Sequence, residues 1–175
     1  RDQWMATDFT RERILNADAT TVSVGHYEGG VYNNYWVLIF SYPENSHTED
    51  YRQEVLDLVN AQRAKYGLTA LEMGDDNLTA AAQTRAEEIA VVNSHVRPDG
   101  SKCFTVLKDY GVTDTPTGEN AAWGSVSPEE VVNAWMNSEG HRANILNPEA
   151  RKMSVGYYYN SNSTWGHQWI QIFTK

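Results

Sequence analysis

Residues 127–146 read SPEEVVNAWMNSEGHRANIL, and this stretch begins with the clearest helix start in the chain. Ser127 and Glu130 stand three residues apart, so they can form a capping box in front of an apolar run. The apolar side chains of that run recur at helical spacing and predict one buried face: Val131, Val132, Trp135 and Met136. We expect the helix to continue to Gly140, with a short helical turn bearing His141 after it.

Helices and loops are predicted upstream of this stretch. Residues 48–66 and 77–92 carry apolar side chains on one face, and the second of these helices has an alanine-rich buried side. A polar loop at 95–101, a short helix at 103–110 and a loop at 113–124 are expected next, because Pro and Gly interrupt regular structure there.

Two strands are predicted at the end of the chain, from Met153 to Tyr159 and from Gln168 to Thr174. The segment between them is rich in turn-forming residues, which is typical of a hairpin. Helices followed by strands, without alternation of the two, predict an α+β fold in which helices pack on an antiparallel sheet.

The composition excludes several classes of partner. The 175 residues carry a net charge of −9, and an acidic surface repels the phosphates of nucleic acid. No apolar run approaches the roughly 20 residues of a membrane span, so the chain is not transmembrane. Cys103 is the single cysteine and can form no intrachain disulfide. Because the chain begins at Arg1, we expect any signal peptide to lie outside it.

The first 40 residues resemble the last 40. Three short segments match at one offset of 131 residues: Trp4-Met5 with Trp135-Met136, Ile14-Leu15-Asn16 with Ile145-Leu146-Asn147, and Val24-Gly25 with Val155-Gly156. After a turn the offset becomes 133, and Trp36–Phe40 matches Trp169–Phe173. We interpret residues 1–47 as a partial repeat, a late helix plus β-hairpin, followed by a linker. Chance similarity between two hairpins is the alternative.

The partial repeat lacks the polar residues of the second copy. Thr10 stands in the place of His141, and Thr7 in the place of Ser138. An apolar strand such as Tyr35–Phe40 invites pairing with another chain when it is left bare. We therefore expect it to pack on the main domain, or to support self-association through residues 1–40.

Several motifs together carry a resemblance to a known family. Residues 135–146 resemble the bacterial signature W-x-x-S-x-G-H-R-x-N-I-L, and Gly118-Glu119-Asn120 resembles the G-E-N motif. Further matches are to the opening helix, the first cleft histidine and the closing strands: Val59–Arg63, Ser94-His95, Val155-Gly156 and Gln168–Phe173. Residues 48–175 thus resemble the CAP superfamily (the SCP/PR-1-like extracellular domain) of bacterial type.

The resemblance implies a three-layer α-β-α sandwich with a mainly antiparallel sheet, and an extracellular or secreted location. It also implies a cleft lined by two histidines and acidic residues, which in this chain are His95, Glu119 and His141. Ser138 lines the same cleft where the eukaryotic pattern has a second glutamate. Some members bind a divalent metal there and others bind sterols or lipids, and the family has no agreed enzymatic activity.

Each cleft residue also has a structural interpretation. His95 can be a solvated loop residue, His141 can interact with a helix end, and Glu119 can accept backbone N–H bonds. Two neutral imidazoles and a carboxylate can also ligate zinc or a similar ion, so His95, His141 and Glu119 form a candidate metal set. The sequence holds no H-E-x-x-H and no G-x-S-x-G, and the lone Cys103 reads as a small buried residue.

Three functions remain open at this point. The favoured one is a secreted binding module whose cleft takes a metal ion, a small molecule, a lipid or a peptide. The second is a structural or adhesive module in a tandem array, which the partial repeat favours. The third is a metal-assisted hydrolase, for which the residues supply no protein nucleophile.

Overall fold

The computed structural model describes residues 11, 14–15, 21–41 and 48–175. Contacts divide the chain into two compact units, Arg1–Ser46 and His47–Lys175. The predicted late helix of the first unit falls mostly on residues 4–10, which lie outside the described residues.

The second unit is built on a four-stranded sheet of order β3-β5-β6-β4. The strands β5 (Lys152–Tyr159) and β6 (His167–Thr174) form the central antiparallel hairpin. Strand β4 (Pro116–Trp123) pairs antiparallel with β6, whereas the two-residue β3 (Glu72–Met73) pairs parallel with β5. The sheet is therefore mainly antiparallel, as predicted.

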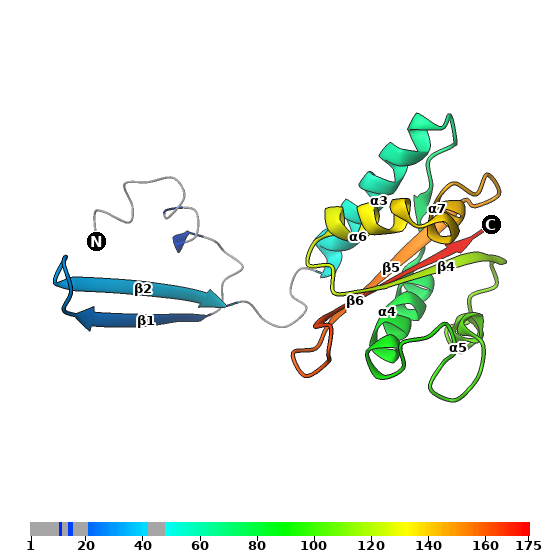
Figure 1. Ribbon diagram of the computed structural model, residues 1–175. Helices are drawn as coiled ribbons and strands as arrows, with labels where there is room; N and C mark the ends of the chain where they lie inside the picture. The colour runs from blue at the N-terminus through cyan, green and yellow to red at the C-terminus, as the bar shows by residue number, and fades with distance from the viewer. Residues whose placement is uncertain (1–10, 12–13, 16–20, 42–47) are drawn as a thin grey trace. The chain divides into compact units, whose positions relative to one another are not determined.

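Helices cover both faces of this sheet (Figure 1). One face packs against α3 (Thr48–Lys65), α6 (Pro128–Asn137) and α7 (Glu139–Ile145). The other packs against α4 (Asp76–Val91), with the 3₁₀ turn Cys103–Thr105 and the short α5 (Val106–Asp109) beside it. The predicted three-layer α-β-α sandwich is confirmed. No helix among the described residues is long and apolar enough to cross a membrane.

The central hairpin sends alternate side chains into the two cores. Val155, Trp169 and Phe173 are fully buried against α3 and α6, whereas Ile170 and Ile172 are buried against α4. Both faces of the sheet are covered, so these strands are apolar on both sides and do not alternate between apolar and polar residues.

Gly156 allows α4 to approach the sheet closely. A Cβ at this position would lie 2.0 Å from the carbonyl oxygen of Ala82 and 2.8 Å from the backbone nitrogen of Gln83. The buried side of α4 is rich in alanine, which allows the same close approach. The alanine-rich face of α4 and Gly156 of β5 therefore pack against each other in one close helix–strand contact.

The expected loop at residues 113–124 is wrong, because residues 116–123 form the edge strand β4. The segment PTGENAAW is poor in β-branched residues and shows no period-two pattern. Its strand conformation comes from pairing with β6 and from burial of the four residues 118–121. Tertiary context overrides local preference here.

Ser127 caps α6 as predicted, but the Glu130 carboxylate reaches the N–H of Val126 and not that of Ser127, so one half of the predicted capping box is formed. The Ser127 hydroxyl accepts a hydrogen bond from the Glu130 backbone N–H at 3.3 Å, and the Glu130 carboxylate accepts one from Val126 N–H at 2.9 Å. The helix ends at Asn137 and not at Gly140, because Ser138 is extended and begins α7 as a separate helix. His141 lies inside α7.

The described part of the first unit contains an antiparallel hairpin of β1 (Thr21–Glu28) and β2 (Asn34–Ser41). The predicted strand Tyr35–Phe40 lies within β2. The eight residue pairs of the β1–β2 hairpin run from Thr21 opposite Ser41 to Glu28 opposite Asn34. The interpretation of this unit as a partial repeat stays a prediction.

Candidate functional site

Glu119 occupies the edge strand β4 and points toward the α4 side of the sheet. Its side chain is 2% exposed, and the fully buried Arg85 of α4 donates to both carboxylate oxygens, from Nε at 3.0 Å and from Nη2 at 3.2 Å. A buried charge is tolerated when it is paired and hydrogen-bonded. Glu119 is thus held in one orientation by a forked ion pair.

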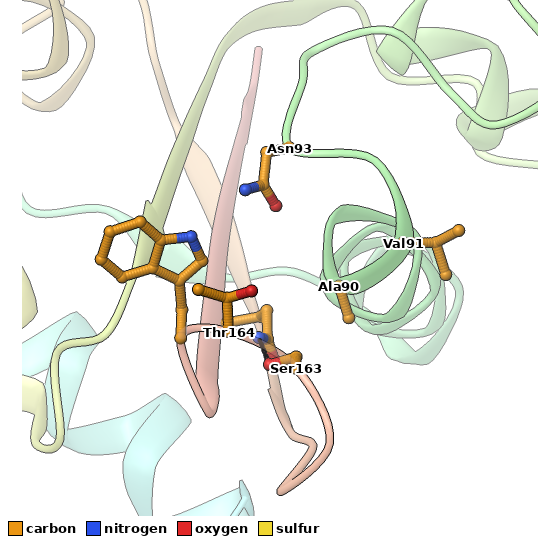
Figure 2. A pocket seen from close by; sticks show the side chains of 7 residues that line it. Ala90, Val91, Asn93, Ser163 and Thr164 are labelled. Atoms are coloured by element: carbon orange, nitrogen blue, oxygen red, sulfur yellow. Dashed lines mark hydrogen bonds between the residues drawn. The ribbon is translucent and has the colours of Figure 1, made fainter.

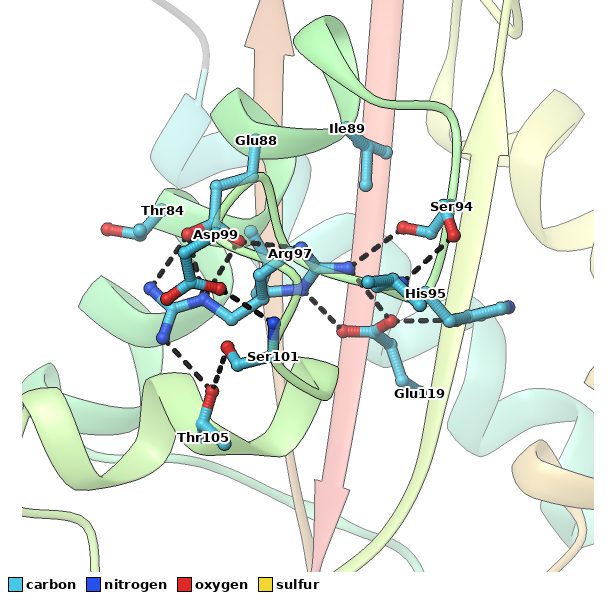
Figure 3. A network of polar contacts seen from close by, with 12 residues as sticks. Thr84, Glu88, Ile89, Ser94, His95, Arg97, Asp99, Ser101, Thr105 and Glu119 are labelled. Carbon is cyan, nitrogen blue, oxygen red and sulfur yellow. Dashed lines mark hydrogen bonds and ion pairs between the residues drawn. The ribbon is translucent and has the colours of Figure 1, made fainter.

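His95 follows the C-terminal end of α4 and reaches the same carboxylate. Its Nδ1 lies 2.7 Å from Glu119 Oε1, while the imidazole side chain stays 55% exposed. Its backbone carbonyl accepts a hydrogen bond from Cys103 N–H at 3.1 Å. The ring is therefore anchored at one nitrogen, while more than half of the side chain stays exposed to solvent. Figure 3 shows His95 and Glu119 joined in this way.

A network of charges behind His95 fixes its loop (Figure 3). Arg85 also donates to Glu88 at 2.6 Å and to the Ser94 carbonyl at 3.1 Å. Arg97, in the loop itself, donates to Glu88 at 2.7 Å and to Asp109 at 2.7 Å. These contacts connect α4, the His95 loop and α5 through alternating charges.

Sequence reasoning missed Arg85, Glu88 and Arg97. One signal was available, because Arg85 lies on the face of α4 that carries Ala81, Ala82, Ala86 and Ile89. An arginine in a buried stripe requires a buried anion, and Glu119 is that anion. Its position could not be read from the sequence, since 34 residues separate the two.

His141 lies in α7, which packs on the other face of the sheet. The Asn120 amide donates to the backbone carbonyl of His141 at 3.1 Å and to Gln171 Oε1 at 3.0 Å. Asn144 of α7 donates to Asn120 Oδ1 at 2.8 Å and to the Glu119 carbonyl at 3.2 Å. Consecutive residues of the edge strand, Glu119 and Asn120, thus hold the two histidine segments from opposite faces.

Gly118 makes room for this docking of α7. A Cβ on Gly118 would lie 2.7 Å from Asn144 Cγ. The three residues of the G-E-N motif therefore have separate roles here: Gly118 admits Asn144, Glu119 orients His95, and Asn120 binds α7. Ser138 is half-buried at the junction of α6 and α7, and its side chain makes no capping bond there.

The two histidines have pKa shifts of opposite sign. The hydrogen bond to Glu119 raises the pKa of His95 above its ordinary value despite partial burial. Burial lowers the pKa of His141, and the positive charge of His95 lowers it further. The imidazoles are therefore within electrostatic range of each other. For Glu119, burial alone would raise the pKa, but the bonds from His95 and Arg85 outweigh it and lower the pKa.

The donor set for a metal ion is smaller than the sequence suggested. Among the described residues, no group of three or more His, Cys, Asp or Glu side chains is placed to hold a metal ion. Both Glu119 oxygens are engaged by Arg85, and one of them also by His95. With Glu119 engaged in this way, the two imidazoles are the candidate donors that remain, and the three-ligand set stays a prediction.

Two hollows lie outside this histidine pair. One, of about 260 Å³, is bounded by the end of α4 and the β5–β6 turn (Figure 2) and is lined by Ala90, Val91, Asn93, Ser163, Thr164, Trp165 and Gln168. The other, of about 320 Å³, is mainly apolar and is lined by Lys102, Phe104, Thr105, Leu107, Lys108, Val112, Asp114 and Pro116. Neither includes His95 or His141.

Comparison with known protein families identifies the family to which this fold and these motifs belong. Residues 56–173 match the family described as CAP, the cysteine-rich secretory protein family. This match covers more than half of the chain, so the chain belongs to the CAP family. The predicted family is confirmed, although this member has only one cysteine.

Relatives of the chain come from bacteria and plants. It is 41% identical to the uncharacterized protein YkwD of Bacillus subtilis over 127 residues, which cover 71% of this chain and 49% of YkwD. It is 34% identical to the uncharacterized membrane protein YlbC of the same organism, over 63% of this chain and 33% of YlbC. Pathogenesis-related protein 1C of Nicotiana tabacum is 29% identical, over 69% of this chain and 63% of the plant protein. The chain thus spans about half or less of the two bacterial relatives.

Solved structures show the same fold. An extracellular SCP-domain protein of Bacillus anthracis has a TM-score of 0.65 at 25% identity, over 80% of this chain and 47% of that protein. An outer surface protein of Borrelia burgdorferi also has a TM-score of 0.65, at 23% identity, over 75% of this chain and 96% of the Borrelia protein. The second likeness supports the fold alone.

Proposed function

We propose that this chain is an extracellular ligand-binding module whose site lies between His95 and His141, with a divalent metal such as zinc as its first candidate ligand. The extracellular setting is supported by the family description, which names secretory proteins, and by the relative from Bacillus anthracis, which is called an extracellular protein. A binding role agrees with a site in which a charged network orients one exposed imidazole.

The hydrogen bond from His95 to Glu119 carries the proposal. A carboxylate 2.7 Å from Nδ1 favours the tautomer with the proton on that nitrogen, so the lone pair of Nε2 is left available. Metal-binding histidines commonly have such a carboxylate behind them, which fixes the ring and raises its basicity. Arg85 in turn fixes the carboxylate.

The residues present fit a metal ion held by two imidazoles, with remaining positions open to water or to a ligand atom. His95 and His141 would supply nitrogen ligands, which suit zinc and similar ions. A bound ion would supply Lewis acidity and a place for an oxygen of a second ligand. Ser138, at the N-cap of the helix that carries His141, would supply a hydroxyl for hydrogen bonding to such a ligand.

The pH dependence of metal binding follows from the two pKa shifts. A ligating imidazole must be neutral, so protons compete with the metal. The raised pKa of His95 means that this competition begins above the ordinary histidine value of about 6.5 as pH falls. The lowered pKa of His141 keeps that ring neutral to lower pH. His95 therefore governs the loss of affinity on acidification.

Calorimetric titration with zinc tests the proposal. Binding to the whole chain is expected at pH 7.5 and is expected to weaken at least about tenfold at pH 5.5. His95→Ala and His141→Ala should each abolish it. His26→Ala is the matched control, because His26 lies on β1 in the first unit and should not matter. Equal binding by wild type and both site variants would overturn the metal proposal.

A lipid is a second candidate ligand, favoured by the apolar 320 Å³ hollow beside α5. Its lining combines Phe104, Leu107 and Val112 with the ammonium groups of Lys102 and Lys108. This composition suits a hydrocarbon chain with an anionic head group. Oleate binding to the whole chain should be lost in Val112→Asp, because Val112 lines the hollow and is only half-buried, and kept in His141→Ala. Binding that survives Val112→Asp would exclude this hollow.

A hydrolytic role has less support. Burial raises the pKa of the Cys103 thiol to about 11, and the Glu119 charge adds to the rise. A thiol with that pKa is almost entirely protonated at neutral pH and is a poor nucleophile. Catalysis would therefore depend on a water activated by a bound metal, and the binding proposal comes first.

A further inference from the structure

The hairpin β1–β2 carries apolar side chains on both faces. Val24 is 59% exposed, Trp36 is 55% exposed and Ile39 is 61% exposed. Alternate residues of a strand point to opposite faces, so these side chains cannot all be covered by packing on one side. Within the described part of the first unit, no helix packs on either face. A two-stranded hairpin of this kind is marginally stable alone.

This hairpin corresponds pair by pair to the core hairpin β5–β6. Thr21 opposite Ser41 matches Lys152 opposite Thr174, and all eight pairs continue in the same register to Glu28–Asn34 and Tyr159–His167. The change of offset from 131 to 133 residues falls wholly in the turns, at residues 29–33 and 160–166.

The two faces correspond as well. Val24 and Trp36 share one face, like Val155 and Trp169, which are fully buried toward α3 and α6. The opposite face carries Ser23, Gly25, Val37 and Ile39, matching Ser154, Gly156, Ile170 and Ile172. In the second unit that face packs against α4, where Ser154 contacts the Thr79 hydroxyl at 3.2 Å.

Gly25 is the residue that indicates what covers the hairpin. A Cβ on Gly25 would meet only Val37 Cβ at 3.9 Å, an ordinary contact, so the hairpin itself does not need a glycine there. Glycine in a strand interior weakens the strand and often marks close approach of another backbone. At the equivalent Gly156, that backbone is the helix α4, whose Ala82 carbonyl would lie 2.0 Å from a Cβ.

We propose that β1–β2 is the core hairpin of another CAP-type unit, separate from the one formed by residues 48–175, and that it docks the N-terminal half of a CAP domain. In this arrangement an alanine-faced helix like α4 packs on the Gly25 face, and a helix like α3 packs on the Trp36 face. The occupant is thus a segment of the chemistry of residues 48–126: two amphipathic helices and an edge strand. A flat apolar partner or a lipid would not need the glycine.

The CAP-type unit completed around β1–β2 lacks the histidine site. Leu38 stands where Gln171 stands in β6, and Gln171 is the residue that accepts from the Asn120 amide beside His141. An apolar residue at this position cannot join that polar network. The docked unit therefore has a structural role, and ligand binding stays with residues 48–175.

Titration of the whole chain with a separate polypeptide of residues 48–126 tests this inference. The hairpin β5–β6 is covered by the helices of its own unit, so we expect the probe to bind at β1–β2. We expect saturable 1:1 binding, with new protection of the amides of residues 22–40 against hydrogen exchange. Gly25→Leu and Ile39→Asp should each weaken binding about tenfold or more. Val31→Ala, in the turn, is the matched control and should bind like wild type.

Three results would overturn the proposal. The first is absence of binding at millimolar probe, and the second is equal binding by Gly25→Leu and wild type. The third is protection of residues 22–40 in the chain without probe, with a dimer seen by sedimentation that Trp36→Ser disperses. That third outcome would assign the hairpin to a second copy of this chain and not to a CAP N-terminal half.

Discussion

Replacement of Glu119 by Gln is expected to destabilise the second unit by about 3 kcal/mol, because it leaves the buried Arg85 charge short of a partner. The carboxylate accepts three bonds, two from Arg85 at 3.0 and 3.2 Å and one shared with His95 at 2.7 Å. Glutamine keeps one acceptor, but its NH₂ group must then face a donor. Breaking a buried ion pair on one side costs roughly 3–5 kcal/mol. Arg85 keeps its bond to Glu88 at 2.6 Å, which places the loss at the lower end.

The assay is urea unfolding of the whole chain followed by circular dichroism at the helical band. Glu149→Gln is the matched control, because Glu149 forms an exposed ion pair with Lys175 and is 65% exposed. Exposed pairs are worth at most about 1 kcal/mol, so the control should change the free energy of unfolding by less than that. A loss below about 1 kcal/mol in Glu119→Gln would refute the claim that this carboxylate holds the site together.

The same variant has a definite pH signature. The lowered pKa of Glu119 contributes stability above the unfolded glutamate value of about 4.3, and that contribution is lost as pH falls through the folded pKa. The raised pKa of His95 contributes stability below about 6.5, which is lost as pH rises through the folded pKa. The gap between wild type and variant should therefore be largest near pH 6 and should narrow toward both pH 3 and pH 9.

Three further predictions concern packing, the thiol and the docking of α7. In the same urea assay, Gly156→Ala should lower the free energy of unfolding of the second unit by about 3 kcal/mol or more, because its Cβ would meet the α4 backbone. Gly140→Ala has nothing within 4 Å of its Cβ and should stabilise α7 by about 0.5–1 kcal/mol. Cys103, buried with a pKa of about 11, should react with iodoacetamide at pH 7 only after urea unfolding; prompt labelling of the folded chain would argue against burial. Asn120→Ala should speed hydrogen exchange in α7, and unchanged exchange would mean that the Asn120–His141 bond does not hold this helix.

Most of the fold could be predicted from local patterns, and the errors share one cause. The start of the helix at Ser127 and the final hairpin have strong local signals and were confirmed, whereas the end of that helix was predicted too late, at Gly140 and not at Asn137. Strand β4 has none, because PTGENAAW becomes a strand only through pairing with β6. The two-residue β3 is likewise too short to leave a pattern. Ser138 separates α6 from α7 without a Pro or Gly to mark the break.

The site was predicted only as far as its motif residues. His95 and Glu119 are joined as a motif comparison would suggest, but the role of Glu119 depends on Arg85, which no motif named. Because both oxygens of the Glu119 carboxylate are already hydrogen-bonded, its observed role is to orient His95 and not to ligate a metal. Such roles come from contacts between distant elements, here α4 and β4, and spacing along the chain does not encode them.

Imidazole nitrogen NMR of the free protein tests the central claim, that Glu119 orients His95 for ligand binding, most directly. The account predicts that neutral His95 carries its proton on Nδ1 with an unprotonated Nε2, and that its pKa lies above that of His141. In Glu119→Gln the pKa of His95 should fall toward the ordinary value. A neutral His95 protonated on Nε2, or a His141 pKa above that of His95, would contradict the account.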